Sequence, residues 1–247
     1  MRNLRLVLEY DGTDFAGWQR QLEQRTVQGT VEQALAAILG APVVLRGAGR
    51  TDSGVHARAQ VASFETASAI PCEGLRRGLN GNLPADVAIV AVEEVDAGFD
   101  ARRAARGKHY AYRVWNAPSR SPLVARVSWH LYRPLDVEAM NLAAAALLGE
   151  HDFSAFRAAG CDSKNPVRTL RRAEWIVEPP AMLVLHLEAT AFLRNMARVI
   201  AGTLVEVGLH ARPASDVRRI LEGRDRNLAG RTAPAQGLTL EEVTYTV

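Results

Sequence analysis

Runs in which apolar and polar residues alternate predict the strands of this chain. Leucines occupy every second position in residues 4–8, and the same pattern returns in residues 183–187. A period of two places alternate side chains on opposite faces of a sheet, so one face of each run can pack on a core. The predicted strands are residues 4–8, 43–45, 59–64, 87–92, 109–115, 168–177 and 182–190.

Apolar residues spaced three or four apart predict helices between these strands. Thr26 is a favourable N-cap and Gly40 a typical helix end, so together they bound the clearest helix. Asp136 opens a helix in the second half of the chain in the same way. The predicted helices are residues 27–39, 71–79, 137–148 and 192–208.

The order of these elements predicts the fold class. The first half runs strand, helix, strand, strand, helix, strand, and helices and strands follow in a similar order in the second half. We therefore predict an α+β fold of two related α/β halves that share one long sheet. The expected boundary separates residues 1–107, which contain a glycine-rich loop, from residues 108–247.

The composition is that of an ordinary globular protein, with 48% hydrophobic and 23% charged residues in 247. Arg5 and Glu9 interrupt the apolar run at the start, so we expect neither a signal peptide nor a membrane span, and the cytoplasm as compartment. Cys72 and Cys161 are too few for a disulfide framework. The six histidines show no metal-ligand spacing, so we expect no metal.

Arginine supplies almost all of the positive charge. Only Lys108 and Lys164 among the 30 basic residues are lysines, although the formal net charge is just +3. Arginine is suited to phosphate recognition, but a compositional bias explains the count equally well. Placement is more informative: residues 99–108, which include Arg102, form the densest basic segment. This segment is either a docking strip for an RNA backbone or a solvated linker.

Residues 46–58 have the composition of an active site. Asp52 is their only acidic residue, among three arginines and three glycines. Glycines allow close approach of another molecule, and arginines fit a polyanionic substrate delivered to a nucleophile or base. The alternative is a surface turn in which Asp52 bonds only its own backbone. The stretch matches neither a Walker phosphate loop nor a dinucleotide fingerprint, so no nucleotide cofactor is expected.

Several motifs, taken together, resemble one family. Residues 49–57 (GRTDSGVHA) resemble the catalytic signature of the tRNA pseudouridine synthase A family. The run 17–21 (GWQRQ), the Lys-x-Tyr-x-Tyr pattern from Lys108 and a Gly-Leu pair at 237–238 are also similar to that family. The resemblance implies the pseudouridine synthase fold, in which ferredoxin-like (RRM-like) halves share a continuous, mainly antiparallel sheet flanked by helices.

The resemblance also implies a reaction and a substrate. The enzyme would isomerise uridine to pseudouridine at positions 38, 39 and 40 of the tRNA anticodon stem-loop, without a cofactor. It implies a homodimer in which one subunit positions RNA for the other. Attack of the carboxylate at C1′, its addition to C6 and removal of a sugar proton all stay open as mechanisms.

Site residues follow from matching the family's motifs to this chain. Asp52 would be the nucleophile, Tyr110 would pack against the target base, and Arg198 would pair with Asp52. Leu238 would lie beside the base. Further candidates for substrate binding are Arg50, Arg102 and, as a weaker one, His56.

The expected shifts in the pKa of Asp52 explain why a nucleophilic carboxylate would need an arginine nearby. A free aspartate has a pKa of about 3.9, and burial under a substrate raises a carboxyl pKa by up to about 3 to 5 units. A nearby cation lowers it by about 1 to 3 units. Arg198 would therefore keep Asp52 ionised once RNA covers the site.

Two rivals from other classes use the same residues. A noncatalytic RNA-binding protein would need the arginines and tyrosines without chemistry, and a base-removing hydrolase would use Asp52 to cleave and not to isomerise. A hydrolase triad in residues 151–157 (HDFSAFR) is a weaker alternative, because triad members are assembled across a fold and no Gly-x-Ser-x-Gly elbow is present.

Overall fold

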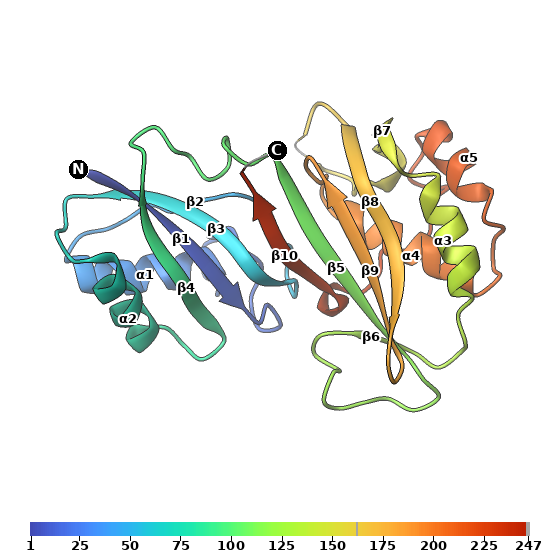
Figure 1. Cartoon of the computed structure of the whole chain (residues 1–247), viewed down its shortest axis with the longest axis horizontal. Helices are drawn as coiled ribbons and strands as arrows, with labels where there is room; N and C mark the ends of the chain where they lie inside the picture. The colour runs from blue at the N-terminus through green and yellow to red at the C-terminus, as the bar shows by residue number, and fades with distance from the viewer. Residues whose placement is uncertain (162, 246–247) are drawn as a thin grey trace. The chain divides into compact units, whose positions relative to one another are not determined.

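The computed structural model describes residues 1–161 and 163–245. The chain forms two compact units; in Figure 1 the first is drawn in blue to green together with the dark red last strand, and the second runs from green to orange and red. Unit 1 consists of residues 1–106 together with the chain from Leu240 onward, and unit 2 consists of Gly107–Thr239. Unit 1 is thus built from two segments that are separated in sequence by the whole of unit 2.

Unit 1 is a sheet with two helices. Its antiparallel core joins β1 (Arg2–Tyr10) to β3 (His56–Thr66) and β4 (Val87–Val95). The short β2 (Arg46–Gly47) pairs with β3, and β10 (Leu238–Thr244) lies next to β3 in the strand order. Helices α1 (Val27–Leu39) and α2 (Cys72–Asn82) complete the unit. One face of the sheet is fully buried, including Leu4, Leu6, Leu8, Ala62 and Ile89.

Unit 2 also combines a sheet with helices. The strand order is β5 (Gly107–Asn116), β9 (Met182–Ala189), β8 (Val167–Glu178) and β7 (Gly149–Asp152), all antiparallel. The short β6 (Trp129–Leu131) pairs in parallel with β5. The helices are α3 (Val137–Ala145), α4 (Met196–Gly208) and α5 (Asp216–Gly223), and two 3-10 turns cover Ser154–Phe156 and Ala235–Gly237.

The α+β class with mainly antiparallel pairing is confirmed. Helix α1 begins and ends as its caps predict: the Thr26 side chain accepts a hydrogen bond from the Gly29 amide, and Gly40 is left-handed at φ 70°. Asp136 caps α3 in the same way by accepting from the Ala139 amide. The alternation in the strands is also confirmed, because Tyr110 and Tyr112 lie opposite Leu187 and Leu185 across β5 and β9.

Several boundaries differ from those predicted. Residues 43–45 form no strand; β2 begins at Arg46 instead. Helix α2 continues to Asn82, three residues beyond its predicted end, and α3 ends at Ala145 and not at 148. Helix α4 begins at Met196, four residues later than predicted, because Asn195 has a left-handed backbone at φ 60°. Strands β6, β7 and β10 and helix α5 were not predicted.

The division into units also differs from the sequence-based boundary. The chain divides after Arg106, and residues from 240 onward belong to the first unit, whereas the prediction left them in the second. The reason is β10, which pairs beside β3; an ion pair of 3.4 Å joins Arg58 Nε of β3 to Glu241 Oε2. Among the described residues, no helix has the length and apolar character needed to span a membrane.

Candidate active site

Asp52 lies in unit 1, in the loop between β2 and β3, and is half-buried. Its loop is fastened to the segment that follows β1. The Trp18 amide donates to the Thr51 carbonyl at 3.0 Å. The Gly54 amide and the Ser53 hydroxyl both donate to the Phe15 carbonyl, at 3.3 and 3.1 Å. Main-chain bonds on both sides of Asp52 therefore fix the position from which its carboxylate projects.

Phe15 and Trp18, whose main chains bond to this loop, have buried side chains. Both side chains are only 2% exposed. They are therefore packing residues, with no ring face exposed for stacking on a base. Gly47 of β2 lies against Trp18: a Cβ atom there would be 2.6 Å from the indole ring. Within the run 17–21, Gly17 and Trp18 are the residues that contact the loop.

A buried polar network holds the residue before Asp52. The Tyr10 hydroxyl and Thr51 Oγ1 are 2.8 Å apart, and Gln60 Nε2 donates to the Gly49 carbonyl at 3.0 Å. Burial raises the pKa of Tyr10 to about 12, so its hydroxyl remains protonated over the physiological range. Sequence analysis missed this network; the signal that could have revealed it is a pair of polar residues, Tyr10 and Gln60, placed among the apolar positions of two strands.

Gly17 is required by the close approach of two chain segments. Its backbone is left-handed at φ 101°, and a Cβ atom would lie 2.8 Å from the Thr51 carbonyl oxygen. Any side chain at this position would push the Asp52 loop away. The contact explains the glycine of the run 17–21 in steric terms.

His56 helps to hold the turn after β1. It is 4% exposed, its Nδ1 accepts a hydrogen bond from the Gly12 amide at 3.0 Å, and Nδ1 lies 3.2 Å from Asp11 Oδ1. Arg50 and Arg102, the other candidates in unit 1, are exposed.

Tyr110 and Arg198 belong to unit 2. Tyr110 in β5 is 7% exposed and meets the Phe192 ring edge to face, with centroids 4.9 Å apart. Arg198 lies in the first turn of α4, where its Nε donates to the Ala233 carbonyl at 2.8 Å and its Nη1 to Asn195 Oδ1 at 3.1 Å. Two side-chain bonds therefore orient the guanidinium.

Leu238 follows the last 3-10 turn of unit 2 and is 5% exposed. The turn packs tightly against Tyr112, because a Cβ atom at Gly237 would lie 2.6 Å from Tyr112 Cζ. The Tyr112 hydroxyl donates to the Pro234 carbonyl at 2.9 Å, and burial raises its pKa, which keeps the donor protonated. Tyr112 thus holds the turn that precedes Leu238.

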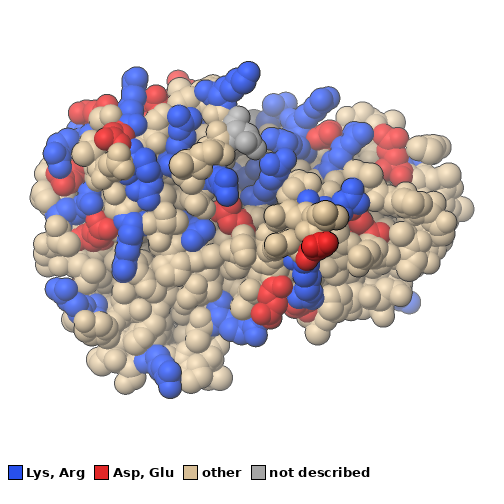
Figure 2. Space-filling model, turned by 180° about the vertical axis from the view of Figure 1, so that it is seen from behind, with Lys and Arg blue, Asp and Glu red and all other residues tan. Residues whose placement is uncertain are grey.

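Positive charge is widespread on the surface of both units. On the face that Figure 2 shows, Lys and Arg side chains outnumber Asp and Glu. This agrees with a sequence pI of about 9.1. Such a surface favours association with a polyanion.

Comparisons with known proteins identify relatives along nearly the whole chain. A family model described as tRNA pseudouridine synthase matches residues 6–102 and 143–246. A Myxococcus xanthus protein named tRNA pseudouridine synthase A is 51% identical over 245 residues, which cover 99% of this chain and 92% of the relative. A protein of the same name from Geobacter sp. (strain M21) is 47% identical, with 99% of both chains covered. One from Acetivibrio thermocellus is 45% identical, with 99% of this chain and all of the relative covered.

Proposed function

Because this chain belongs to the tRNA pseudouridine synthase family, we propose that it isomerises uridine to pseudouridine in tRNA. In this reaction the bond from N1 to C1′ breaks, the uracil turns in place, and C5 bonds to C1′. The same atoms are present before and after, so no co-substrate is consumed. The observation that carries the proposal is the fixed loop around Asp52, within a family match that spans both units.

Asp52 is the proposed nucleophile. Its carboxylate projects from a loop whose main chain is bonded on both sides, which suits a group that must meet a substrate atom at a defined position. Attack at C1′, addition to C6 and removal of a sugar proton all begin from the same ionised carboxylate. All three therefore require Asp52 to be negative while the substrate covers it.

The residues of unit 2 have complementary proposed roles. Tyr110 packs against the target base and Leu238 lies beside it, because both are apolar surfaces that their neighbours hold in one orientation. Arg198 pairs with Asp52 and keeps it ionised under the substrate. Its guanidinium is supported for such a role by the bonds to Ala233 and Asn195.

The proposed substrate-binding residues of unit 1 are Arg50, Arg102 and His56. The two arginines are exposed and able to meet phosphates. His56 is engaged with Gly12 and acts mainly through the turn that it holds. The proposed target is the anticodon stem-loop at positions 38, 39 and 40, and action at neighbouring positions favours recognition of RNA shape over base edges.

The proposed assembly is a homodimer in the cytoplasm, in which one subunit positions tRNA for the other's site. Both the dimer and the compartment are what the resemblance to the family implies. Sedimentation at micromolar concentration should give twice the 26.9 kDa mass of the chain. A species of single mass would contradict the dimer.

Incubation of the pure protein with unmodified tRNA tests the function. Formation of pseudouridine, detected by mass spectrometry after chemical labelling, is the expected result. Release of free uracil would instead identify a hydrolase, and unchanged tRNA that nevertheless binds would identify a noncatalytic RNA-binding protein. Mapping the modified positions tests the assignment to the anticodon stem-loop.

A further inference from the structure

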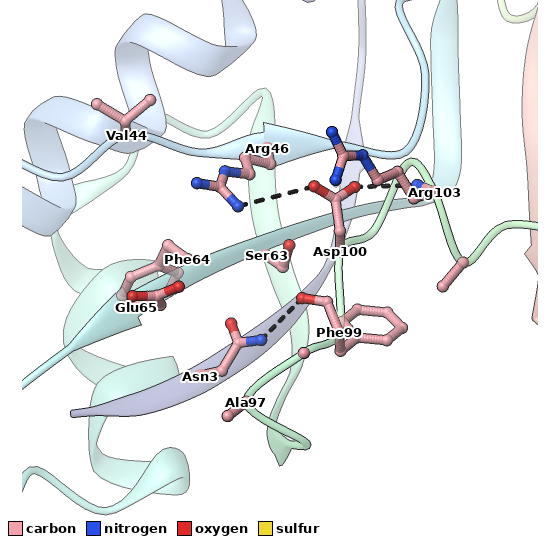
Figure 3. Close-up of a pocket in the computed structure, with 12 residues that line it drawn as sticks. Asn3, Val44, Arg46, Ser63, Phe64, Glu65, Ala97, Phe99, Asp100 and Arg103 are labelled. Carbon is pink, nitrogen blue, oxygen red and sulfur yellow. Dashed lines mark hydrogen bonds and ion pairs between the residues drawn. The ribbon is translucent and has the colours of Figure 1, made fainter.

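Unit 1 contains a pocket of about 630 Å³. Residues of β1, β2, β3 and the loop of residues 97–104 line it (Figure 3). A volume of this size is typical of small-molecule sites and holds a nucleotide. None of the residues assigned above to the reaction is among the described residues that line it. The pocket therefore needs an explanation of its own.

Two arginines that are far apart in sequence meet one carboxylate in this pocket. Arg46 Nη1 of β2 lies 3.8 Å from Asp100 Oδ2. The amides of Arg102 and Arg103 each donate to Asp100 Oδ1 at 2.9 Å. The hydrogen bond from the Arg103 amide and the charges of Arg103 and Arg46 lower the pKa of Asp100, so this carboxyl is ionised at neutral pH. The cluster of Arg46, Arg103 and Asp100 thus carries a net charge of +1.

The arginines, and not the carboxylate, are presented to solvent. The Arg46 side chain is 65% exposed and that of Asp100 only 19%. A separation of 3.8 Å is longer than a hydrogen bond, so Asp100 attracts Arg46 without occupying its N–H donors. Arg103 is also exposed. Each guanidinium has five N–H groups, so both can donate to an incoming anion.

The loop that carries Arg103 is fixed before any ligand arrives. Asn3 Nδ2 donates to the carbonyls of Phe99 and Asp96, at 2.8 and 3.0 Å. Ser63 Oγ accepts from the Ala101 amide at 3.1 Å. These bonds join the loop to β1 and β3, which reduces the ordering cost of binding.

Helix α2 offers a natural comparison. There Glu73 also meets two arginines, Arg76 and Arg77, in the same ratio of charges. Their guanidinium nitrogens donate directly to Glu73 at 2.8 and 2.9 Å. This cluster lies on an exposed helix, and its residues do not line the described pocket. The two clusters therefore have equal net charge. Only the Asp100 cluster lines the pocket, and only in the Glu73 cluster do the guanidinium groups already donate hydrogen bonds to the carboxylate.

We propose that this pocket is a phosphate-binding subsite for the backbone of the RNA substrate, separate from the site of the target nucleotide. Arg46 and Arg103 bind the phosphate, and Asp100 is the positioning residue that holds them. Glu65 lies on the far side of the pocket from Asp100 (Figure 3), so its charge confines the phosphate to the arginine end. The proposal rests on the proposed function, because that function makes RNA the polyanion.

Binding of unmodified tRNA across a range of salt concentrations tests the subsite. The pocket variants are Arg46→Gln and Arg103→Gln, and the matched controls are Arg76→Gln and Arg77→Gln. Each pocket variant should weaken binding by about two- to fivefold at about 0.1 M salt, as expected for an exposed ion pair. The slope of log K against log salt should fall by about one phosphate equivalent, and the double variant should lose no more slope than that, because both arginines share one phosphate.

The controls decide between a pocket and general surface charge. Equal losses in all four variants, or no loss in the pocket variants, would overturn the subsite. Thermal unfolding should be unchanged in all of them, because all four side chains lie at the surface. Conversion by the wild-type protein is scored separately. If the wild-type protein converts uridine and the pocket variants bind tRNA normally, the subsite alone is rejected. If the wild-type protein does not convert uridine but the pocket variants alone lose tRNA binding, the reaction alone is rejected.

Discussion

The loop that carries Asp52 and the elements that carry Tyr110 and Arg198 are held in different ways. Tyr110 sits in the middle of a regular strand, and Arg198 lies in the first turn of a helix. Asp52 lies in an irregular loop whose bonds reach the segment around Phe15 and Trp18. A strand or a helix tolerates substitutions because many main-chain hydrogen bonds hold it in place. A loop held by a few contacts should be sensitive to changes in residues that never touch a substrate.

Removal of the proposed nucleophile should have the largest effect. Asp52→Asn keeps the shape of the side chain and removes its charge, so the rate of conversion should fall by about ten-thousandfold or more. Binding of tRNA should change by less than about threefold, since phosphate contacts supply most of the affinity. Asp96→Asn, an exposed aspartate in the same unit, is the matched control. Measurable conversion by the Asp52 variant would show that another group is the nucleophile.

A methyl group at Gly17 should displace the loop without touching the carboxylate. In Gly17→Ala the new Cβ would lie 2.8 Å from the Thr51 carbonyl oxygen, so the loop must shift. A displacement of about 1 Å costs about a hundredfold in rate, which single-turnover kinetics would measure.

Gly40→Ala is the control for that variant. Gly40 is also left-handed, at φ 70°, but has nothing within 4 Å of its Cβ position. This variant should lose about 1 kcal/mol of stability from backbone strain and keep its rate. Equal losses of rate in the two variants would show that the Asp52 loop is not specially sensitive.

Loss of the buried hydroxyl pair should have a smaller effect. In Thr51→Val the Tyr10 hydroxyl loses its 2.8 Å partner, and kcat should fall by about five- to tenfold while KM stays constant. Thr51→Ser should restore the rate because it returns the hydroxyl. Tyr245→Phe removes a comparable hydroxyl, which donates to the Ala101 carbonyl at 3.0 Å, and should leave kcat unchanged. A rise in KM alone would point to substrate binding and not to loop position.

The last expected effect is confined to high pH and concerns stability, not rate. Tyr10 titrates at about 12 in the folded protein, above its value of about 10 in an unfolded chain. Between these values the unfolded state has lost the proton and the folded state retains it, so stability falls as pH rises. Wild type should lose about 1.4 kcal/mol per pH unit more than Tyr10→Phe over this window, measured by urea unfolding. The exposed Tyr132→Phe should match wild type; no difference at Tyr10 would contradict its burial.

The fold was predictable where one residue decides a local structure. Thr26 and Gly40 fixed the ends of α1, and alternation placed Tyr110 and Tyr112 on the buried face of β5. The start of α4 was not predictable, because a left-handed Asn195 interrupts an otherwise helical pattern. β10 could be read as an apolar segment, but its membership of unit 1 depends on pairing across the whole chain.

In the candidate site, too, features with a local sequence signal were predictable and features that depend on the fold were not. The motif around Asp52 was visible as glycines and arginines, and the comparisons confirm the family. The network of Tyr10, Thr51 and Gln60 was hidden, because it joins three segments that only the fold brings together. Trp18 could not be assigned from the sequence either, because an aromatic residue near an arginine can stack on RNA or pack in a core. Its burial in the structure shows that it packs in the core. The meeting of Arg46 with Asp100 likewise has no local signal.

The split construction of unit 1 has a consequence for biosynthesis. A ribosome makes β1 before unit 2 and β10 after it, because every residue of unit 2 lies between these two strands in the sequence. The half that bears the proposed nucleophile therefore completes its sheet after the other half has been made, although its own first strand emerges first. A nascent chain that stops before Leu240 leaves the edge of β3 without its neighbour, so the sheet next to the Asp52 loop is complete only once β10 has been made.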